Sequence, residues 1–165
     1  LRNMATDNNN NTAATDPTEK ATFAAGCFWG VEKVFRRNFG NNSGFDTRVC
    51  SGTSNHAEAV QIIFNPENTR YETLVEFFYK IHDPTTQNRQ GNDIGTQYRS
   101  AIFYHSLEQK EIAERVTKYV QEKSNNDKDL YQNQKITTEI VDAGTFYNAE
   151  DYHQDYLTKN PHGYE

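Results

Sequence analysis

Cys27 is the residue of this chain whose setting is best suited to nucleophilic chemistry. It lies in the segment Gly-Cys-Phe-Trp-Gly at 26–30, where an apolar stretch ends and a helix is expected to begin. Backbone N–H groups at a helix N-terminus, together with the positive end of the helix dipole, favour the thiolate form of cysteine. A cysteine between a strand and a helix can equally be a small buried hydrophobic residue, so its position alone leaves both interpretations open.

Two aromatic residues directly after Cys27 favour the catalytic interpretation. Phe28 and Trp29, the only tryptophan of the chain, are able to form an apolar pocket beside the sulfur. The flanking residues Gly26 and Gly30 allow a ligand or another backbone segment to approach closely. We therefore predict that Cys27 is a catalytic nucleophile and that Phe28 and Trp29 bind substrate.

Glu58 is the second candidate, because it is expected on an apolar strand face. In the strand predicted over 56–64, the apolar residues Val60 and Ile62 share one face with Glu58. Desolvation there would raise the pKa of the carboxyl group and leave it protonated, and so able to donate a proton. Burial against an arginine such as Arg99 would instead make Glu58 structural, and both interpretations remain open.

The loop predicted over 84–98 holds the third group of candidates. Loops of roughly this length without secondary structure are usually functional. Asp93 and Tyr98 could reach a catalytic site from this loop, which also contains Gly91 and Gly95. Their residue types alone indicate the chemistry only weakly.

Alternating strand and helix patterns position these candidates. Strands are predicted over 21–25, 46–49, 56–64, 99–105 and 135–141. Helices are predicted from residue 28, from the capping-box pair Thr69 and Glu72, from the pair Ser106 and Gln109 to about Lys123, and over 149–159. We expect an α+β fold: a two-layer α/β sandwich with helices packed on a mixed central sheet.

The first of these helices is expected to be amphipathic. Its buried face is predicted to comprise Phe28, Val31, Val34 and Phe35, and its solvated face Lys33, Arg36 and Arg37. Residues 1–19 are rich in Asn, Thr and Ala and are predicted to form a disordered N-terminal tail. Residues 20–165 are predicted to form one catalytic domain.

Composition excludes several functional classes. The net charge of −6 and the pI of about 5.4 argue against a nucleic-acid partner. The sequence shows neither an apolar run long enough to span a membrane nor a signal core, so we expect a monomeric cytoplasmic protein. Two cysteines are too few for a disulfide scaffold, and five histidines without metal-ligand spacing predict no metal.

Four ordered blocks of the sequence resemble the class A methionine sulfoxide reductases, the MsrA family. These blocks are Gly-Cys-Phe-Trp-Gly at 26–30, His-Ala-Glu at 56–58, His-Asp-Pro-Thr-Thr at 82–86, and the segment at 89–100 that contains Gly-Asn-Asp and Thr-Gln-Tyr-Arg-Ser. The resemblance extends from about Phe23 to Tyr164 and includes the segments at 146–150 and 159–164. Enzymes of this kind reverse methionine oxidation.

The resemblance implies an activity and a role for each candidate. The activity is thiol-dependent reduction of peptide-bound and free methionine-S-sulfoxide to methionine, through a Cys27 sulfenic acid. The roles are nucleophile for Cys27, walls around the substrate methyl group for Phe28 and Trp29, acid for Glu58, and ordering of the polar side for Tyr98 and Asp93. The resemblance implies no bound cofactor, with thioredoxin as the physiological reductant or dithiothreitol in its place.

The sequence departs from the family pattern at two places. A family segment with a tyrosine that bonds the sulfoxide oxygen is missing, because Val49 runs straight into Cys50-Ser51-Gly52. The family also continues to a resolving cysteine, whereas this sequence stops at Glu165. We expect Cys50 to be structural, so that the oxidised enzyme stalls after one turnover unless a small thiol reduces it.

Two other functions use the same residues. A cysteine hydrolase would pair Cys27 with His56, His82 or His153 as base and would form an acyl-enzyme. A non-catalytic peptide-binding module would use Phe28 and Trp29 to hold an apolar side chain of its partner.

Overall fold

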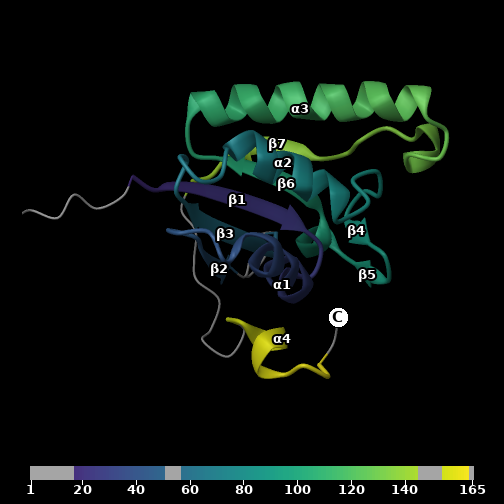
Figure 1. Ribbon diagram of the computed structural model, residues 1–165. Coiled ribbons are helices and arrows are strands. Elements are labelled where there is room, and N and C mark those ends of the chain that lie inside the picture. The colour runs from purple at the N-terminus through teal and green to yellow at the C-terminus, as the bar shows by residue number, and fades with distance from the viewer. Residues whose placement is uncertain (1–16, 51–56, 145–153, 164–165) are drawn as a thin grey trace, which may run out of the picture.

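A five-stranded sheet with β1 (Glu19–Ala25) at its centre is the framework of the computed structural model, which describes residues 17–50, 57–144 and 154–163 (Figure 1). The remaining strands are β2 (Asp46–Cys50), β3 (Ala59–Phe64), β6 (Ser100–Tyr104) and β7 (Glu139–Asp142), and the order across the sheet is β2-β3-β1-β6-β7. All neighbours are antiparallel except β6 and β7, which are parallel. The sheet is therefore mixed, as the sequence predicted.

The register of β1 determines which side chains enter the main core. Phe23 lies opposite Val60 of β3 and Ile102 of β6, and all three side chains are fully buried. Ala21 and Ala25 have the same parity and join the same cluster. Ala24, on the opposite face, belongs to a separate cluster with Ala59 and Ala101.

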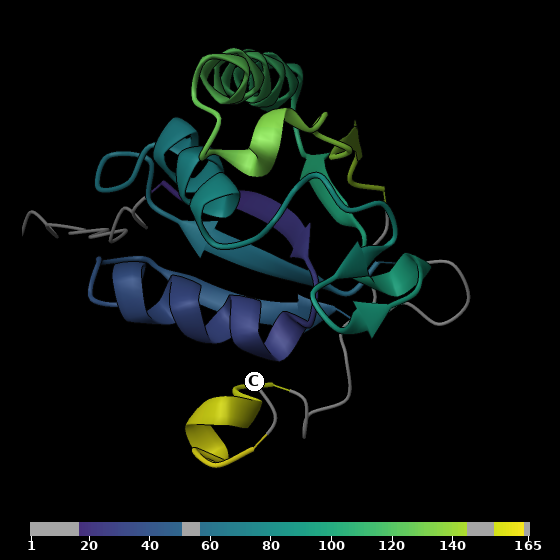
Figure 2. The same cartoon turned by 90° about the vertical axis from the view of Figure 1, so that its right-hand side faces the viewer.

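Three helices cover the Phe23 face of the sheet. They are α1 (Phe28–Phe39), α2 (Tyr71–Lys80) and α3 (Leu107–Asn126), and buried side chains of all three join the main cluster. Figures 1 and 2 show α1 and α2 beside the sheet and α3 crossing above α2. The five-stranded sheet and the layer of helices on its Phe23 face confirm the predicted two-layer α/β sandwich.

Short elements subdivide the loop that the sequence predicted to be without secondary structure. The pair β4 (Arg89–Gln90) and β5 (Asp93–Ile94) forms a small hairpin, and the 3-10 helix η1 (Thr96–Tyr98) follows it. A second 3-10 helix, η2 (Tyr131–Asn133), precedes β7, and the short helix α4 (Tyr156–Lys159) lies near the C-terminus. The prediction of a structureless loop over 84–98 was therefore wrong.

One predicted helix cap is present and the other is not. Ser106 caps α3 by accepting a hydrogen bond from the backbone N–H of Gln109 at 3.2 Å. At α2 the N-cap is Arg70, whereas the Thr69 hydroxyl accepts a hydrogen bond from the side-chain amide of Asn42 at 2.8 Å. The Thr69 capping box was wrong because a partner distant in sequence occupies that hydroxyl.

The buried face of α1 also differs from the prediction. Glu32 is buried at 2% exposure, whereas Val34 is only partly buried. Arg36, predicted to be solvated, pairs with Asp46 at 3.2 Å and with Asp155 at 2.7 Å. The buried face of α1 therefore includes a carboxylate, Glu32, that the prediction did not place there, and Val34 is less buried than expected.

Side chains bond the outer edge of β2, the first strand of the sheet. The Gln154 amide accepts from Val49 N–H and donates to Val49 C=O, both at 2.9 Å. Thr47 N–H donates to the Asp46 carboxylate at 2.8 Å, and Thr47 C=O accepts from Arg36 at 3.3 Å. The backbone groups of both residues are thus paired with side chains.

No helix within the described residues is long and apolar enough to cross a membrane. Of the predicted tail, only residues 17–19 lie in the described part of the chain, and Glu19 already belongs to β1.

Candidate active site

Cys27 occupies the junction between the central strand and the first helix, where the sequence predicted it. Gly26 turns the chain between β1 and α1 with φ of +94°, a conformation that favours glycine. A Cβ atom at this position would lie 2.7 Å from Cγ of Gln90, so a side chain has no room there. Cys27 is then the N-cap residue of α1, and its carbonyl accepts from Val31 N–H at 3.3 Å.

Opposing effects determine the pKa of the Cys27 thiol. Partial burial raises it most, and the charges of Glu58 and Asp93 raise it further. Hydrogen bonds from the backbone N–H groups of Trp29 and Gly30 lower it, as expected at a helix N-terminus. The helix N-terminus therefore favours the thiolate, as expected, but the effect of burial is larger and the pKa lies above its ordinary value.

Glu58 lies directly against the N-terminus of α1. Its Oε2 accepts a hydrogen bond from Phe28 N–H at 3.2 Å, and its own N–H donates to the carbonyl of Gln97 at 2.8 Å. Burial raises the pKa of the Glu58 carboxyl, the bond from Phe28 lowers it, and the charge of Asp93 raises it. Arg99, considered above as a structural partner for Glu58, instead pairs with Glu139 at 3.4 Å. The half-buried carboxyl is thus positioned to hold a proton beside Cys27.

Tyr98 and Asp93 approach the same site from the segment that follows α2. The pKa of the Tyr98 hydroxyl is raised first by desolvation and then by the charge of Glu58, with smaller contributions from Asp93 and Cys27. Asp93 likewise acts on Cys27 and on Glu58. The four residues predicted to be catalytic therefore lie within electrostatic reach of one another. Figure 1 shows the elements that carry or adjoin them, α1 and the β4–β5 hairpin, near the C-terminal end of β1.

The two aromatic residues after Cys27 have different environments. Phe28 is buried in the main core, and its ring centroid lies 6.0 Å from that of Trp29. Trp29 is half-buried and stacks on Tyr156, with 4.0 Å between ring centroids and 17° between planes. Tyr156 is a neighbour of the site that sequence reasoning missed, because α4 lies more than 120 residues from Trp29 in sequence.

Gln90 was also missed. Its amide accepts from Asp83 N–H at 3.0 Å and donates to Asp83 C=O at 2.8 Å, which ties β4 to the end of the α2 segment. Its aliphatic carbons lie against Gly26. The only feature of the sequence that could have indicated Gln90 is its place within the segment 89–100, two residues before Asn92-Asp93.

Cys50 has the surroundings of a structural residue. It ends β2 opposite Ala59 and is 3% exposed. Burial raises the pKa of its thiol to about 11. A buried, protonated thiol is a poor attacking group, which supports the structural interpretation of Cys50.

His82, one of three bases considered for a cysteine hydrolase, already has partners on both ring nitrogens. Nδ1 lies 2.6 Å from the carbonyl of Phe78, and Nε2 lies 2.8 Å from the hydroxyl of Ser100. Burial lowers the pKa of the imidazole to about 4. This ring therefore serves to join α2 to β6; His56 and His153 lie outside the described residues.

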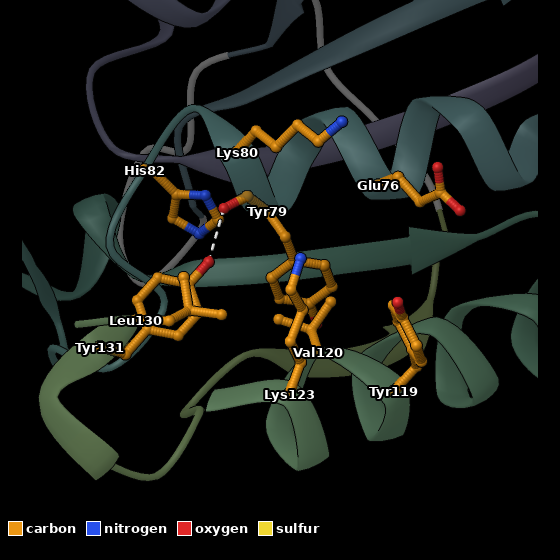
Figure 3. A pocket seen from close by; sticks show the side chains of 9 residues that line it. All are labelled: Glu76, Tyr79, Lys80, His82, Tyr119, Val120, Lys123, Leu130 and Tyr131. Carbon is orange, nitrogen blue, oxygen red and sulfur yellow. Dashed lines mark hydrogen bonds between the residues drawn. The ribbon is translucent and has the colours of Figure 1, made fainter. Parts of the chain in front are cut away.

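His82 also borders a hollow of about 470 Å³ between α2, α3 and η2 (Figure 3). Its walls include Tyr79 and Tyr131, and the Tyr131 hydroxyl donates to the carbonyl of Tyr79 at 2.7 Å. Neither Cys27 nor Glu58 lines this hollow. It is therefore separate from the site assembled around Cys27.

Among the described residues, no three His, Cys, Asp or Glu side chains gather as a candidate metal site.

Known proteins resemble this chain over most of its length. The family described as peptide methionine sulfoxide reductase matches residues 19–165. A probable peptide methionine sulfoxide reductase of Schizosaccharomyces pombe is 49% identical, over 87% of this chain and 91% of that protein. The peptide methionine sulfoxide reductase MsrA of Methanothermobacter thermautotrophicus is 47% identical, over 87% of this chain and 88% of that protein.

Solved structures share the fold. The reduced form of Mxr1 from Saccharomyces cerevisiae aligns with a TM-score of 0.78 and 34% identity, covering 90% of this chain and 88% of that one. The structure of Mxr1 in complex with Trx2 aligns with a TM-score of 0.63 and 30% identity, covering 88% of this chain and 91% of that one.

The geometry predicts that Glu58→Gln lowers the pKa of the Cys27 thiol. The negative charge of Glu58 raises that pKa, so a neutral amide of similar size should increase the thiolate fraction near pH 8. The pH dependence of Cys27 alkylation by iodoacetamide, followed by peptide mass spectrometry, measures this shift. Glu72→Gln, which removes an equal charge from the surface pair with Arg115, is the matched control. An unchanged or raised pKa in Glu58→Gln would contradict the electrostatic coupling.

Proposed function

The chain belongs to the peptide methionine sulfoxide reductase family, and from that premise we propose that it reduces methionine-S-sulfoxide, free or within a peptide, through a Cys27 sulfenic acid. The observation that carries this proposal is the contact between Glu58 and the first N–H of α1, beside Cys27. A nucleophile and a carboxyl with a raised pKa thereby lie next to each other at the start of α1.

The proposed reaction moves one oxygen atom from substrate to enzyme. The Cys27 sulfur attacks the sulfoxide sulfur and forms an S–S bond, while the Glu58 carboxyl gives a proton to the oxygen, which is a poor leaving group as an anion. The protonated oxygen then passes to the Cys27 sulfur as this S–S bond and the original S–O bond break, and the thiol proton of Cys27 replaces the proton that Glu58 gave. The Tyr98 hydroxyl donates a hydrogen bond to the same oxygen, and Asp93 orders this polar side. One thiol and one sulfoxide become one sulfenic acid and one thioether, so atoms and electrons balance.

Phe28 and Trp29 are proposed to bind the methyl group of the substrate. The Trp29 indole is half-buried next to the nucleophile, so its apolar surface is available to a small group. Contact with a methyl group would orient the sulfur toward Cys27, and orientation of reacting atoms lowers the barrier of a two-reactant step.

Thioredoxin is the proposed physiological reductant, which is supported by the structure of the relative Mxr1 in complex with Trx2. Thioredoxin attacks a disulfide, so it requires a partner thiol for oxidised Cys27. Cys50 is too deeply buried to be that partner. A small thiol such as dithiothreitol would instead reduce the sulfenic acid directly.

We predict that Cys27→Ser abolishes sulfoxide reduction and leaves the fold intact, because a hydroxyl keeps the packing but is a far weaker nucleophile at neutral pH. The measurement is mass spectrometry of dabsyl-methionine sulfoxide mixed with protein and dithiothreitol. Loss of one oxygen with the parent protein supports the reductase and neither a hydrolase nor a binding module. Parent-level turnover by Cys27→Ser would reject the assignment.

Glu58→Gln is predicted to lower the reduction rate by roughly 10²-fold or more, the usual cost of a lost general acid. The thiolate fraction of Cys27 should rise in the same variant, which by itself would increase the reduction rate. A lower rate therefore reports the loss of the acid and not a change in the thiol. Single-turnover rates at pH 7 with saturating methionine sulfoxide measure the chemical step. A normal rate would make Glu58 structural.

A protein of these 165 residues is predicted to form about one methionine per enzyme when reductant is absent. Cys50 should remain a free thiol, because a buried cysteine cannot reach oxidised Cys27 without backbone movement. Methionine is counted by mass spectrometry and the remaining thiols are titrated. Addition of dithiothreitol should then restore turnover, whereas thioredoxin should do so only when a second thiol is supplied that forms a disulfide with Cys27. A Cys27–Cys50 disulfide with thioredoxin-dependent turnover would show Cys50 to be the resolving cysteine.

A further inference from the structure

Residues 154–156, before and at the start of α4, each contact α1 or the neighbouring strand β2. Gln154 bonds both backbone groups of Val49 in β2, Asp155 bonds to α1, and Tyr156 stacks on Trp29. Figures 1 and 2 show α4 beside α1, on the side away from α3. The segment 154–156 therefore packs against α1, the helix whose N-cap is Cys27.

Glu32 provides the central attachment. Its Oε2 accepts from Asp155 N–H at 2.9 Å, and its Oε1 accepts from the Thr47 hydroxyl at 2.9 Å. Burial raises the pKa of its carboxyl, against the opposing effect of these two bonds. Burial of a carboxylate at 2% exposure costs free energy unless its oxygens accept hydrogen bonds. Separation of Glu32 from Asp155 or from Thr47 is therefore unfavourable. Residues of α1, β2 and the segment 154–156 meet at this one side chain.

The backbone of Asp155 is held in a specific conformation by these bonds. Asp155 has φ of 52°, in the left-handed region that few residues other than glycine adopt. Its carboxylate also pairs with Nε of Arg36 at 2.7 Å. Asp155 is thus held at two points: its backbone N–H bonds to Glu32, and its carboxylate pairs with Arg36. These two contacts determine the position of the next residue, Tyr156.

Tyr156 in turn determines the position of the Trp29 indole. The two rings are nearly parallel, at 17°, with centroids 4.0 Å apart. Such stacked pairs contribute beyond the apolar area that they bury. Trp29 is two residues from Cys27, so a rotation of its indole would change the apolar surface beside the sulfur.

We propose that Glu32 is a positioning residue: by holding Asp155, it places Tyr156 against Trp29 and thereby fixes the indole that receives the methyl group of the sulfoxide. Only the expected effect of Glu32 on KM rests on the proposed function. The arrangement of Glu32, Tyr156 and Trp29 can be tested on the folded protein without any substrate.

The experiment uses Trp29, the only tryptophan of the chain, as its reporter. Glu32→Leu removes both acceptors, and Tyr156→Leu removes the stacked ring. Glu32→Gln and Tyr156→Phe are the conservative partners, because an amide oxygen can still accept from Asp155 N–H and a phenyl ring can still stack. Val116→Ala, in the α3 part of the core, controls for loss of stability away from Trp29.

Emission of Trp29 and its quenching by acrylamide are measured with selective excitation. Both Leu variants should shift the emission to longer wavelength and increase quenching, while the conservative variants and Val116→Ala should match the parent. Steady-state kinetics with methionine sulfoxide and dithiothreitol should show a KM raised roughly tenfold in the Leu variants with a smaller change in kcat, since binding is lost in ground state and transition state alike. The conservative variants should restore most of that loss.

Each outcome decides a separate point. Parent-like emission and quenching in Glu32→Leu would overturn the positioning role. Altered emission with unchanged KM would overturn its link to substrate binding. A parent protein that reduces no sulfoxide would reject the proposed function, and the fluorescence would still decide the positioning role. If Glu32→Leu does not fold, Glu32→Ala, which removes the same two acceptors, tests the role of Glu32. Tyr156→Leu against Tyr156→Phe tests the stacking on Trp29 separately, because the half-buried Tyr156 lies outside the main core.

Discussion

The hydrogen bond from Phe28 N–H to Glu58, at 3.2 Å, joins the two halves of the site and determines much of the surrounding geometry. It links the first turn of α1, which carries Cys27, to the start of β3. Backbone pairing of Glu58 with Gln97 then brings the chain next to Tyr98 into the same place. The order β3-β1-β6 in the sheet serves this constraint, because it places the strands that carry these groups on either side of β1.

Burial has a larger effect than the helix N-terminus on the pKa of Cys27. The pKa values of Cys27 and Glu58 are both raised, mainly by burial, and the charge of Glu58 adds to the increase at Cys27. Thiolate is the form of cysteine that oxidants and alkylating reagents attack, so a raised pKa reduces the fraction of Cys27 open to such reactions.

The features predicted correctly from the sequence depend on local patterns, and the features missed depend on distant partners. An apolar run, Gly26 and the following helical stripe were sufficient to place Cys27 between β1 and α1. Glu32 bonds a residue 123 positions away, and Trp29 stacks on a ring that is also far away in sequence, so no local period reveals either contact. The sign of the shift at Cys27 likewise required knowledge of burial, because dipole and desolvation act in opposite directions.

The bonding of the β2 edge has a consequence for how this protein behaves among its own copies. An edge strand normally presents free N–H and C=O groups on which a strand of another molecule can assemble. Here the backbone groups of Thr47 and Val49 are bonded by the side chains of Asp46, Arg36 and Gln154. An incoming strand would first have to displace those side chains. The bonds by which Gln154 holds the segment before α4 against β2 thus also oppose growth of the sheet from one molecule into the next.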